Sequence, residues 1–360
     1  MQACFALFLG CTSLVVWNSC PAIACASAIK EDETIVFFPT LAHPSDDGGQ
    51  WVAQVHGWIF EAESDSWLRT ASLAGFLALL DLGPEQAETL IFRQRARPFL
   101  ADNERGKRIS IRIGTSTFEL EPSAEDGHFF GIVRLDVRTA DRLARDGWLR
   151  YTAVMAPRDQ REFAGQIRLL EPTGVSVISD IDDTVKVSEV TDRQKLVENT
   201  FLLPFREVEG MAGLYRQWAR RGATFHFVSA SPWQLYEPLA DFARQAGFPH
   251  STYHLRRIRL KDRSVLSLLA DPLTAKLQVI EPLMETYPQR RFILVGDSGE
   301  RDPEVYAKIA EERPEQVLRI YIRDVTGQAA DTPRYQATFG KLPEEKWQIF
   351  DEPSAIPTSF

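Results

Sequence analysis

The chain has 360 residues, of which 44% are hydrophobic and 25% charged, and its formal net charge is -9 at pH 7. This composition is ordinary for a soluble globular protein, and the length suggests two domains rather than one. The negative net charge excludes a general electrostatic attraction to nucleic acid or to an anionic membrane surface, although it is compatible with a local basic patch.

The first 29 residues contain no Asp, Glu, Lys or Arg, and residues 5–17 are mostly apolar. Small residues at Ala22 and Ala24 fit the pattern that precedes a cleavage point, so residues 1–26 are predicted to be a signal peptide. The usual positive segment before the apolar run is missing. A buried helix or membrane anchor is the alternative reading, but Pro21 and the short apolar run argue against a full span. The prediction places the mature protein outside the cytoplasm, in the periplasm.

All four cysteines lie in this same stretch, at positions 4, 11, 20 and 25. Cleavage after Ala24 or Ala26 would leave at most one thiol, so neither a disulfide framework nor a cysteine zinc site is predicted. The run from Ala22 to Cys25 also resembles a lipoprotein box that lacks its usual first Leu. A lipid anchor on Cys25 is therefore an alternative outcome of the same export.

Residues 34–171 are predicted to form a β-rich amino-terminal domain. Several segments alternate apolar with polar residues, as half-buried strands do, and polar turns separate them. Short strands of this kind favour a β-sandwich. A short helical run covers 73–82, and His56 and His128 are interpreted as isolated residues with structural or exposed roles. The predicted strands are 50–60, 108–113, 117–120, 128–135, 149–155 and 165–170.

From about residue 174 the pattern changes to apolar strands that alternate with longer helical segments, which is typical of a parallel α/β sheet. This second predicted domain spans 174–326, and the polar tail 327–360, which contains several prolines, is expected to wrap the surface or to be partly loose. The predicted strands are 175–179, 224–228, 253–258, 291–295 and 317–322, and the predicted helices lie near 191–203, 211–221, 233–246, 274–286 and 303–312.

Three acids follow the first of these strands in the run Asp180-Ile181-Asp182-Asp183-Thr184. Open α/β sheets bind ligands at the carboxyl ends of their strands, and crowded carboxylates are easiest to accommodate around a hard cation such as Mg²⁺. Asp180 could attack phosphorus to form an aspartyl-phosphate, and Asp182 could protonate the leaving group and later activate water. A solvated acidic turn is the alternative reading of these residues alone.

Polar groups follow three further segments. The strand 224–228 ends at Ser229, where a hydroxyl before a helix could bind a phosphate oxygen, and Ser231 with Pro232 suits the start of that helix. An ordinary capped turn is the alternative. Lys276, early in a predicted helix, is unfavourable against the helix dipole unless it pairs with carboxylate or phosphate. A surface lysine is the alternative there.

The last strand end carries Gly296-Asp297-Ser298-Gly299, with Asp302 five residues after Asp297. Glycine permits a tight loop with close backbone approach. Asp297 can coordinate the same cation as Asp180, whereas Asp302 could orient a metal-bound water or cap the next helix.

This ordered set of acid pair, hydroxyl, amine and acid pair resembles the haloacid dehalogenase-like phosphohydrolases over roughly 174–326. The resemblance implies a Rossmann-like parallel sheet. A closer resemblance is to the actin-patch-associated phosphatidate phosphatase catalytic domain, a family related to lipin. It is carried by Asp180 through Lys186, Asn199-Thr200-Phe201, Ser231 through Leu235, and Gly296 through Tyr306. The family resemblance implies a Mg²⁺-dependent phosphatase that releases phosphate from phosphatidate and leaves diacylglycerol.

The resemblance also implies residue roles. Asp180 would be the nucleophile and Asp182 the general acid and base. Ser229 and Lys276 would bind the transferring phosphoryl group, beside Thr184, which braces the loop rather than reacting. Mg²⁺ would be held by Asp180, the backbone carbonyl of Asp182, Asp297 and, in support, Asp302. Phosphoryl transfer depends on positioning and charge neutralisation of this kind.

A lipid substrate implies an apolar or interfacial approach to this site and peripheral contact with a membrane. The segments 201–205 and 233–236 could supply apolar side chains, although a core role is the favoured interpretation. The basic run 255–263 could meet anionic head groups, or be a solvated strand edge. No nucleic-acid partner is expected.

Two other functions stay open at this point. The same chemistry could act on another phospholipid or on a soluble phosphomonoester. Alternatively, the domain could be a non-catalytic phosphatidate-binding module, although a binder does not need the acid pair Asp180 and Asp182.

Overall fold

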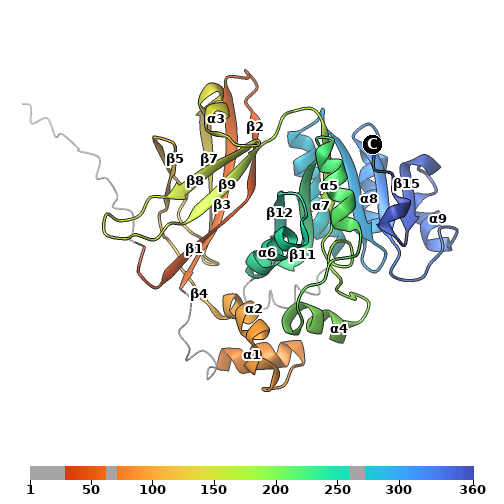
Figure 1. Ribbon diagram of the computed structural model, residues 1–360, viewed down its shortest axis with the longest axis horizontal. Helices are drawn as coiled ribbons and strands as arrows, with labels where there is room; N and C mark the ends of the chain where they lie inside the picture. Colours follow the sequence, from red (N-terminus) through yellow and green to blue (C-terminus); the bar gives the residue numbers. More distant parts are fainter. Residues whose placement is uncertain (1–28, 62–70, 259–271) are drawn as a thin grey trace, which may run out of the picture.

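The structure of the protein is a computed structural model, which describes residues 29–61, 71–258 and 272–360. Two sheets lie side by side in it, a nine-stranded sheet from the first half of the chain and a six-stranded sheet from the second (Figure 1). The predicted signal peptide, residues 1–26, lies outside the described residues.

The first sheet is confirmed as the β-rich part of the chain. Its strands are β1 (Glu33–Phe38), β2 (Thr40–Pro44), β3 (Gln50–Glu61), β4 (Asp102–Asn103), β5 (Ser110–Ile113), β6 (Ser116–Glu119), β7 (His128–Asp136), β8 (Trp148–Ala153) and β9 (Ala164–Leu169). The long strand β3 pairs with β1 and β2 along one side and with β7 and β4 along the other. From β2 the sheet continues through β9, β8 and β5 to β6, with β2 and β9 parallel.

This sheet curls until its edges meet. Beyond β6, the backbone N–H groups of Glu121 and Ala124 donate to the carbonyls of Phe130 and His128 in β7, at 2.9 and 2.8 Å. An apolar cluster that includes Trp51 and Ile111 fills the inside of the curl. The predicted sandwich of two packed sheets is not confirmed, because all these strands belong to one continuous sheet.

His56 and His128 have the structural role that was predicted, but they are not isolated from each other. Pairing of β3 with β7 brings His56 Nε2 to 2.9 Å from His128 Nδ1, and both side chains are buried. The pair depends on strand register between residues far apart in the chain, which spacing alone does not reveal.

Two helices, α1 (Ala71–Leu80) and α2 (Leu90–Leu100), follow β3, and α3 (Val137–Leu143) follows β7. The buried guanidinium of Arg95 in α2 donates to the carbonyls of Thr200 and Leu203 at 2.7 and 2.8 Å and lies 3.6 Å above the ring of Phe205. Arg95 therefore fixes α2 against the segment that follows the acidic motif in the second half of the chain.

The second sheet is parallel throughout, as predicted. Its strands are β10 (Val175–Ser179), β11 (Thr224–Pro232), β12 (Ser251–Arg256), β13 (Arg291–Asp297), β14 (Val317–Arg323) and β15 (Trp347–Phe350), in the spatial order β12-β11-β10-β13-β14-β15. Chain order reverses between β10 and β13, and such a switch point is where open parallel sheets hold their ligands. The polar tail supplies β15, which pairs with β14.

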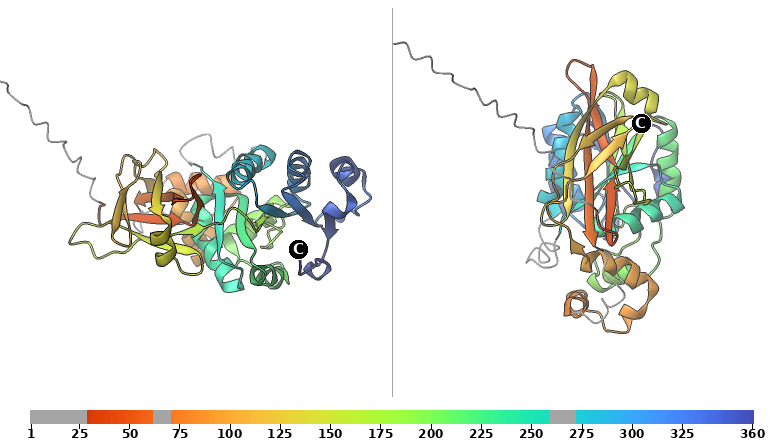
Figure 2. Two further views of the ribbon diagram at one scale, coloured as in Figure 1. Left: turned by 90° about the horizontal axis from the view of Figure 1, so that it is seen from above. Right: turned by 90° about the vertical axis from the view of Figure 1, so that its left-hand side faces the viewer.

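Helices cover both faces of this sheet (Figure 2). They are α5 (Met211–Arg220), α6 (Tyr236–Ala246), α7 (Pro272–Thr286), α8 (Asp302–Glu312) and α9 (Pro333–Phe339), whereas the short α4 (Arg193–Val197) lies beyond the end of the sheet (Figure 1). Because strand side chains alternate, Val177 packs in the cluster with α5 and α6, whereas its neighbour Ile178 packs in the cluster with α7, α8 and α9. The first cluster also contains Phe38 and Trp58, so the two sheets share one core.

Arg290, just before β13, ties the linker between the two sheets to the strand that carries the acidic motif. Its guanidinium is buried, and it donates to the hydroxyls of Ser176 and Thr224 and to the carbonyls of Glu171, Thr173 and Val175. Removing this donor leaves several buried acceptors without a partner, which costs more than the loss of the hydrogen bonds themselves.

We expect Arg290→Met to lower the free energy of unfolding by about 3 kcal/mol. Arg291→Met is the matched control, since Arg291 is the exposed neighbour and its loss should change stability little. Urea denaturation followed by circular dichroism measures both variants. Equal stability of the two variants would contradict the anchoring role of Arg290.

Candidate active site

The acidic side chains come together at the switch point between β10 and β13. Asp180 directly follows β10, Asp297 is the last residue of β13, and Asp302 is the first residue of α8. The two strands pair with Ser179 opposite Val295, and the Asp180 N–H donates to the Val295 carbonyl at 2.9 Å. Parallel pairing of neighbouring strands therefore brings Asp180 to Asp297, and the short turn from β13 into α8 adds Asp302.

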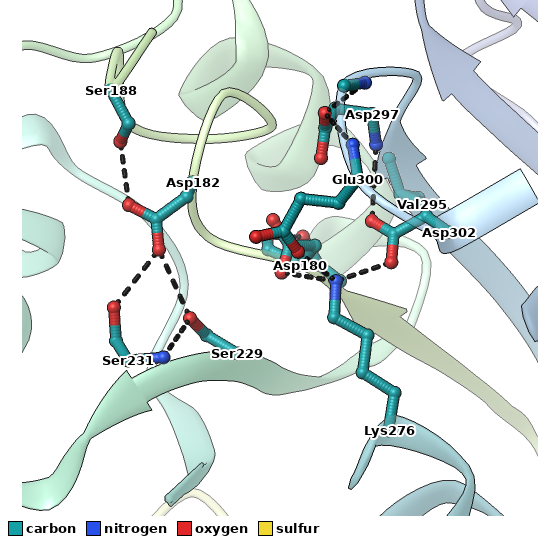
Figure 3. A network of polar contacts seen from close by, with 12 residues as sticks. Asp180, Asp182, Ser188, Ser229, Ser231, Lys276, Val295, Asp297, Glu300 and Asp302 are labelled. Carbon is teal, nitrogen blue, oxygen red and sulfur yellow. Dashed lines mark hydrogen bonds and ion pairs between the residues drawn. The ribbon is translucent and has the colours of Figure 1, made fainter. Parts of the chain in front are cut away.

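Asp180, Asp297 and Asp302 form a compact carboxylate trio (Figure 3). Each offers one oxygen, and these oxygens all lie within 4.8 Å of one another. All three residues are buried, and among the described residues neither Asp180 Oδ2 nor Asp297 Oδ2 has a hydrogen-bond partner. Buried carboxylate oxygens without donors fit a hard divalent cation, which accepts such ligands and neutralises them.

Burial raises the pKa of Asp180 and of Asp297 well above the ordinary range, and the neighbouring acids add to the effect. Burial likewise raises the pKa of Asp302, to about 6. Without a cation the trio therefore resists ionisation, because three carboxylates cannot all be charged in so small a volume.

Glycine and backbone N–H groups hold the trio in place. Asp297 Oδ1 accepts from the N–H groups of Gly299 and Glu300 at 2.6 and 3.2 Å, and Asp302 Oδ2 accepts from the Asp297 N–H at 3.2 Å. Asp302 packs directly against Gly296, where a Cβ would lie 2.3 Å from Asp302 Oδ2. The close approach predicted from the glycines is thus made by a carboxylate.

Lys276 in α7 reaches the trio from below (Figure 3). Its buried Nζ lies 2.9 Å from Asp180 Oδ1 and 3.0 Å from Glu300 Oε2, and it also donates to Asp302 Oδ1. Burial opposes its charge, but the three carboxylates raise the pKa of Lys276 well above its usual value, so it is a fixed cation. The structure therefore brings Lys276 to the acids, as the pairing argument predicted, and adds Glu300, which the sequence did not indicate.

Asp182 points away from the trio (Figure 3). Its Oδ1 accepts from Ser188 Oγ at 2.6 Å and from Lys186 Nζ at 2.8 Å, and its Oδ2 accepts from Ser231 Oγ at 3.0 Å and Ser229 Oγ at 3.2 Å. Burial alone would raise the pKa of Asp182, but Lys186 and the hydroxyls outweigh it and lower that pKa to about 2.

Ser229 thus lies beside Asp182 and not beside the trio. Ser231 is part of β11, and its hydroxyl donates to Asp182, so the expected helix cap is wrong. The turn that follows has Pro232 at its N-cap position, without a side-chain cap. Lys186, Ser188 and Ser231 are functional candidates that sequence reasoning missed, because only the fold brings the loop residues Lys186 and Ser188 and the β11 residue Ser231 to Asp182.

The carboxylate of Asp183 stabilises the loop that follows Asp182. Asp183 has a φ of 53°, a left-handed conformation, and its carboxylate accepts from the N–H groups of Ser188, Glu189 and Val190 at 2.7–2.9 Å. Thr184 is fully buried, and its hydroxyl has no partner among the described residues. The bracing role suggested for Thr184 stays a prediction, since its hydroxyl forms no hydrogen bond with the described loop.

The apolar residues considered for a lipid approach are mostly core. Phe201, Trp233 and Leu235 are buried, whereas Leu203 is exposed. In the basic run 255–263, residues 259–263 lie outside the described part, and Arg257 forms an ion pair with Asp126 at 2.6 Å.

Comparison with known proteins identifies the domain that carries this site. Residues 175–324 match the profile of a family described as "Phosphatidate phosphatase APP1, catalytic domain". This segment of the chain belongs to that family. The matched residues begin at β10 and end just after β14, and they include the trio, Lys276 and Asp182.

Two curated relatives are similar to about half of this chain. An uncharacterized protein of Schizosaccharomyces pombe is 35% identical over 190 residues, which is 51% of this chain and 31% of that protein. Phosphatidate phosphatase APP1 of Saccharomyces cerevisiae is 32% identical over 170 residues, which is 46% of this chain and 28% of that protein. The alignments therefore span less than a third of each relative.

Among solved structures, cytosolic 5'-nucleotidase IIIB bound to cytidine superposes with a TM-score of 0.32 at 13% identity, over 50% of this chain and 82% of that one. A structural similarity with so low a TM-score supports no conclusion about the chemistry of the site.

The predicted export to the periplasm, with its alternative of a lipid anchor on Cys25, is wrong. Export to a periplasm implies a bacterial protein, whereas the two relatives are proteins of yeasts. Over the described residues, the helices are all too short or too polar to cross a membrane.

We expect Gly296→Ala to weaken binding of a divalent cation roughly 10- to 100-fold, because the added Cβ must displace the Asp302 carboxylate. Titration calorimetry with Mn²⁺ or Mg²⁺ measures the affinity. Gly213→Ala in α5 is the matched control, since its Cβ would approach no atom closer than 3.9 Å. If the Gly296→Ala variant folds and binds the cation with unchanged affinity, Asp302 is not a ligand of the cation.

The raised pKa of Asp302 predicts a pH dependence. Between its ordinary value of 3.8 and about 6, the unfolded chain is ionised at this residue while the folded, metal-free chain retains the proton. The metal-free protein therefore loses stability as pH rises through this window, and a cation, which favours the ionised form, offsets the loss. We expect the difference in Tm between Mg²⁺ and EDTA to grow over this range, as measured by differential scanning fluorimetry. Asp297→Asn should abolish the difference, and a pH-independent difference would refute the assignment.

Proposed function

We propose that the protein is a Mg²⁺-dependent phosphatidate phosphatase that converts phosphatidate to diacylglycerol and phosphate through an aspartyl-phosphate. The observation that carries this proposal is the buried trio Asp180, Asp297 and Asp302 with Lys276 against it, at the switch point of a parallel sheet. The catalytic-domain family of residues 175–324 supports the phosphatase activity and the lipid substrate.

Asp180 is the proposed nucleophile. In the first step an oxygen of Asp180 bonds to phosphorus while the ester P–O bond breaks, and the leaving diacylglycerol oxygen takes a proton from Asp182. In the second step water attacks the aspartyl-phosphate and gives its proton to Asp182, which releases phosphate and restores both carboxyl groups. Lys276, a permanent cation beside Asp180, stabilises the negative charge of the phosphoryl group.

Asp180, Asp297, Asp302 and the backbone carbonyl of Asp182 would hold Mg²⁺. The ion would supply charge neutralisation and would keep Asp180 ionised despite its burial. Asp182 is ionised and held by Lys186 and hydroxyls in the structure, so it is ready to act as the base of the second step. Its use as the acid of the first step requires that it leaves this network and gains a proton when substrate binds.

Phosphatidate is a membrane lipid, so the proposal includes peripheral contact with a membrane surface. Soluble phosphomonoesters are the competing substrate class. Phe201 and Leu235 are buried in the core, which favours this second class because these two apolar side chains are then not available for contact with a lipid.

We expect the purified protein to release phosphate from phosphatidate in mixed micelles with Mg²⁺ and to lose this activity in EDTA. The Asp180→Asn variant should have a kcat that is lower by roughly 10³-fold or more. Asp351→Asn, at an exposed acid near the carboxyl terminus, is the matched control and should keep full activity. Malachite green detection of phosphate measures the activity of the wild-type protein and of both variants. Turnover of p-nitrophenyl phosphate without turnover of phosphatidate would favour the soluble substrates, and no release from any ester would reject the phosphatase proposal.

A further inference from the structure

A cavity lies where the curled sheet meets the parallel sheet. It has a volume of about 390 Å³, within the range of small-molecule sites, and elements of both sheets line it. Its walls come from β2, β3, β7 and β12 and from the turn after β11, and they include Leu41, Val55, Phe130, Ile132, Trp233 and Tyr253. A lining of this kind suits an apolar ligand.

The inner wall of this cavity is aromatic and carries no charge. The ring of Phe130 stacks on His56 at a centroid distance of 4.3 Å and an interplanar angle of 12°, and Trp233 contacts His56 edge-on at 4.8 Å. Burial lowers the pKa of His56 well below its ordinary value and that of His128 to about 3, so both rings are neutral at neutral pH.

The charged groups near the cavity lie at its rim. Arg257 lies 5.3 Å from the Phe130 ring and pairs with Asp126, while Glu121 is exposed. Burial keeps the remaining histidine of the lining, His254, neutral as well by lowering its pKa to about 4.

Two large apolar side chains remain exposed at this cavity. Phe130 is 37% exposed and Ile132 is 61% exposed, and they are neighbours on one face of β7. Among the described residues only three other large hydrophobic side chains are this exposed: Leu90, Leu203 and Phe360. An exposed apolar pair at the mouth of an apolar cavity marks a binding site more strongly than scattered single residues do.

The short segment from Ser231 to Trp233 connects the Asp182 network to the cavity. Asp182 accepts a hydrogen bond from Ser231, and Trp233, which lines the cavity, follows two residues later, within about 7 Å along an extended chain. In the proposed reaction Asp182 protonates the leaving oxygen, so the diacylglycerol part of the substrate lies on the Asp182 side of the phosphorus. The apolar part of a substrate bound at Asp180 is thus directed toward Trp233.

We infer that this cavity binds one acyl chain of the lipid phosphate that the active site hydrolyses. The inference rests on the proposed function and adds to it the site that recognises the lipid. The phosphate binds at Asp180 and Lys276, the glycerol passes Asp182 and Ser231, and one chain enters between Trp233, Phe130 and Ile132. Each methylene buried there should raise the affinity about fourfold, up to the length that the cavity holds.

The test uses binding, which needs no turnover. Butyl, octyl and dodecyl phosphate, each below its critical micelle concentration, are titrated into full-length Asp180→Asn protein with Mg²⁺. We expect the affinity to rise steeply with chain length. Adding Ile132→Asp at the rim should flatten this dependence, and adding Phe130→Ala should weaken it, with little change for butyl phosphate.

Leu90→Asp is the matched control, because Leu90 is 69% exposed and outside the cavity, so it should leave the chain-length dependence intact. A flat dependence in the reference protein, or the same slope in Ile132→Asp and Leu90→Asp, overturns the inference. Thermal melts of each variant confirm that the fold is intact.

Wild-type turnover separates this inference from the proposed function. Release of phosphate from phosphatidate without any chain-length dependence of binding overturns the acyl site alone. No release of phosphate, combined with a chain-length dependence that Ile132→Asp removes, overturns the phosphatase and supports the cavity as an alkyl-binding site.

Discussion

The active site depends on one electrostatic constraint, which is an excess of buried carboxylates over buried cations. Asp180, Asp297 and Asp302 share a small volume with Glu300 at its edge, and Lys276 is the lysine that opposes them. Buried charge is tolerated only when it is paired, protonated or bound to a metal. Without a cation the trio resists ionisation, and its geometry is consistent with a divalent ion that would take the place of its protons.

The same constraint explains why two carboxylates two residues apart differ so much. Asp180 faces the other acids and its pKa rises, whereas Asp182 faces Lys186 and three hydroxyls and its pKa falls to about 2. Enzymes that use two acids in different roles separate them by environment in this way. The separation is produced by the backbone, because the left-handed residue Asp183 turns the chain so that Lys186 returns to Asp182.

The parallel sheet and its acidic motifs could be predicted from sequence because buried strands appear as continuous apolar runs. The run Val175–Ser179 is β10 with the same bounds, and the acids that follow such runs must meet at one edge. The remainder depends on contacts that spacing does not encode. The His56–His128 pair depends on the register of β3 and β7, which lie far apart in the chain: the two histidines are 72 residues apart. Helix α2 was not predicted because Pro98 and three arginines interrupt the periodic spacing of apolar residues that indicates a helix.

The curled sheet is part of the catalytic domain's core and not a separate attachment. The Phe38 ring of β1 lies 4.0 Å from that of Trp233, which immediately follows the strand end bearing Ser231. On the other side of the site, Arg95 of α2 lies against the ring of Phe205, and Lys186 lies 5.0 Å from the centre of that ring. Since Lys186 also holds Asp182, both flanks of the Asp182 network rest on residues from the first half of the chain. The position of Asp182 therefore depends on packing from the amino-terminal sheet on one side and from helix α2 on the other.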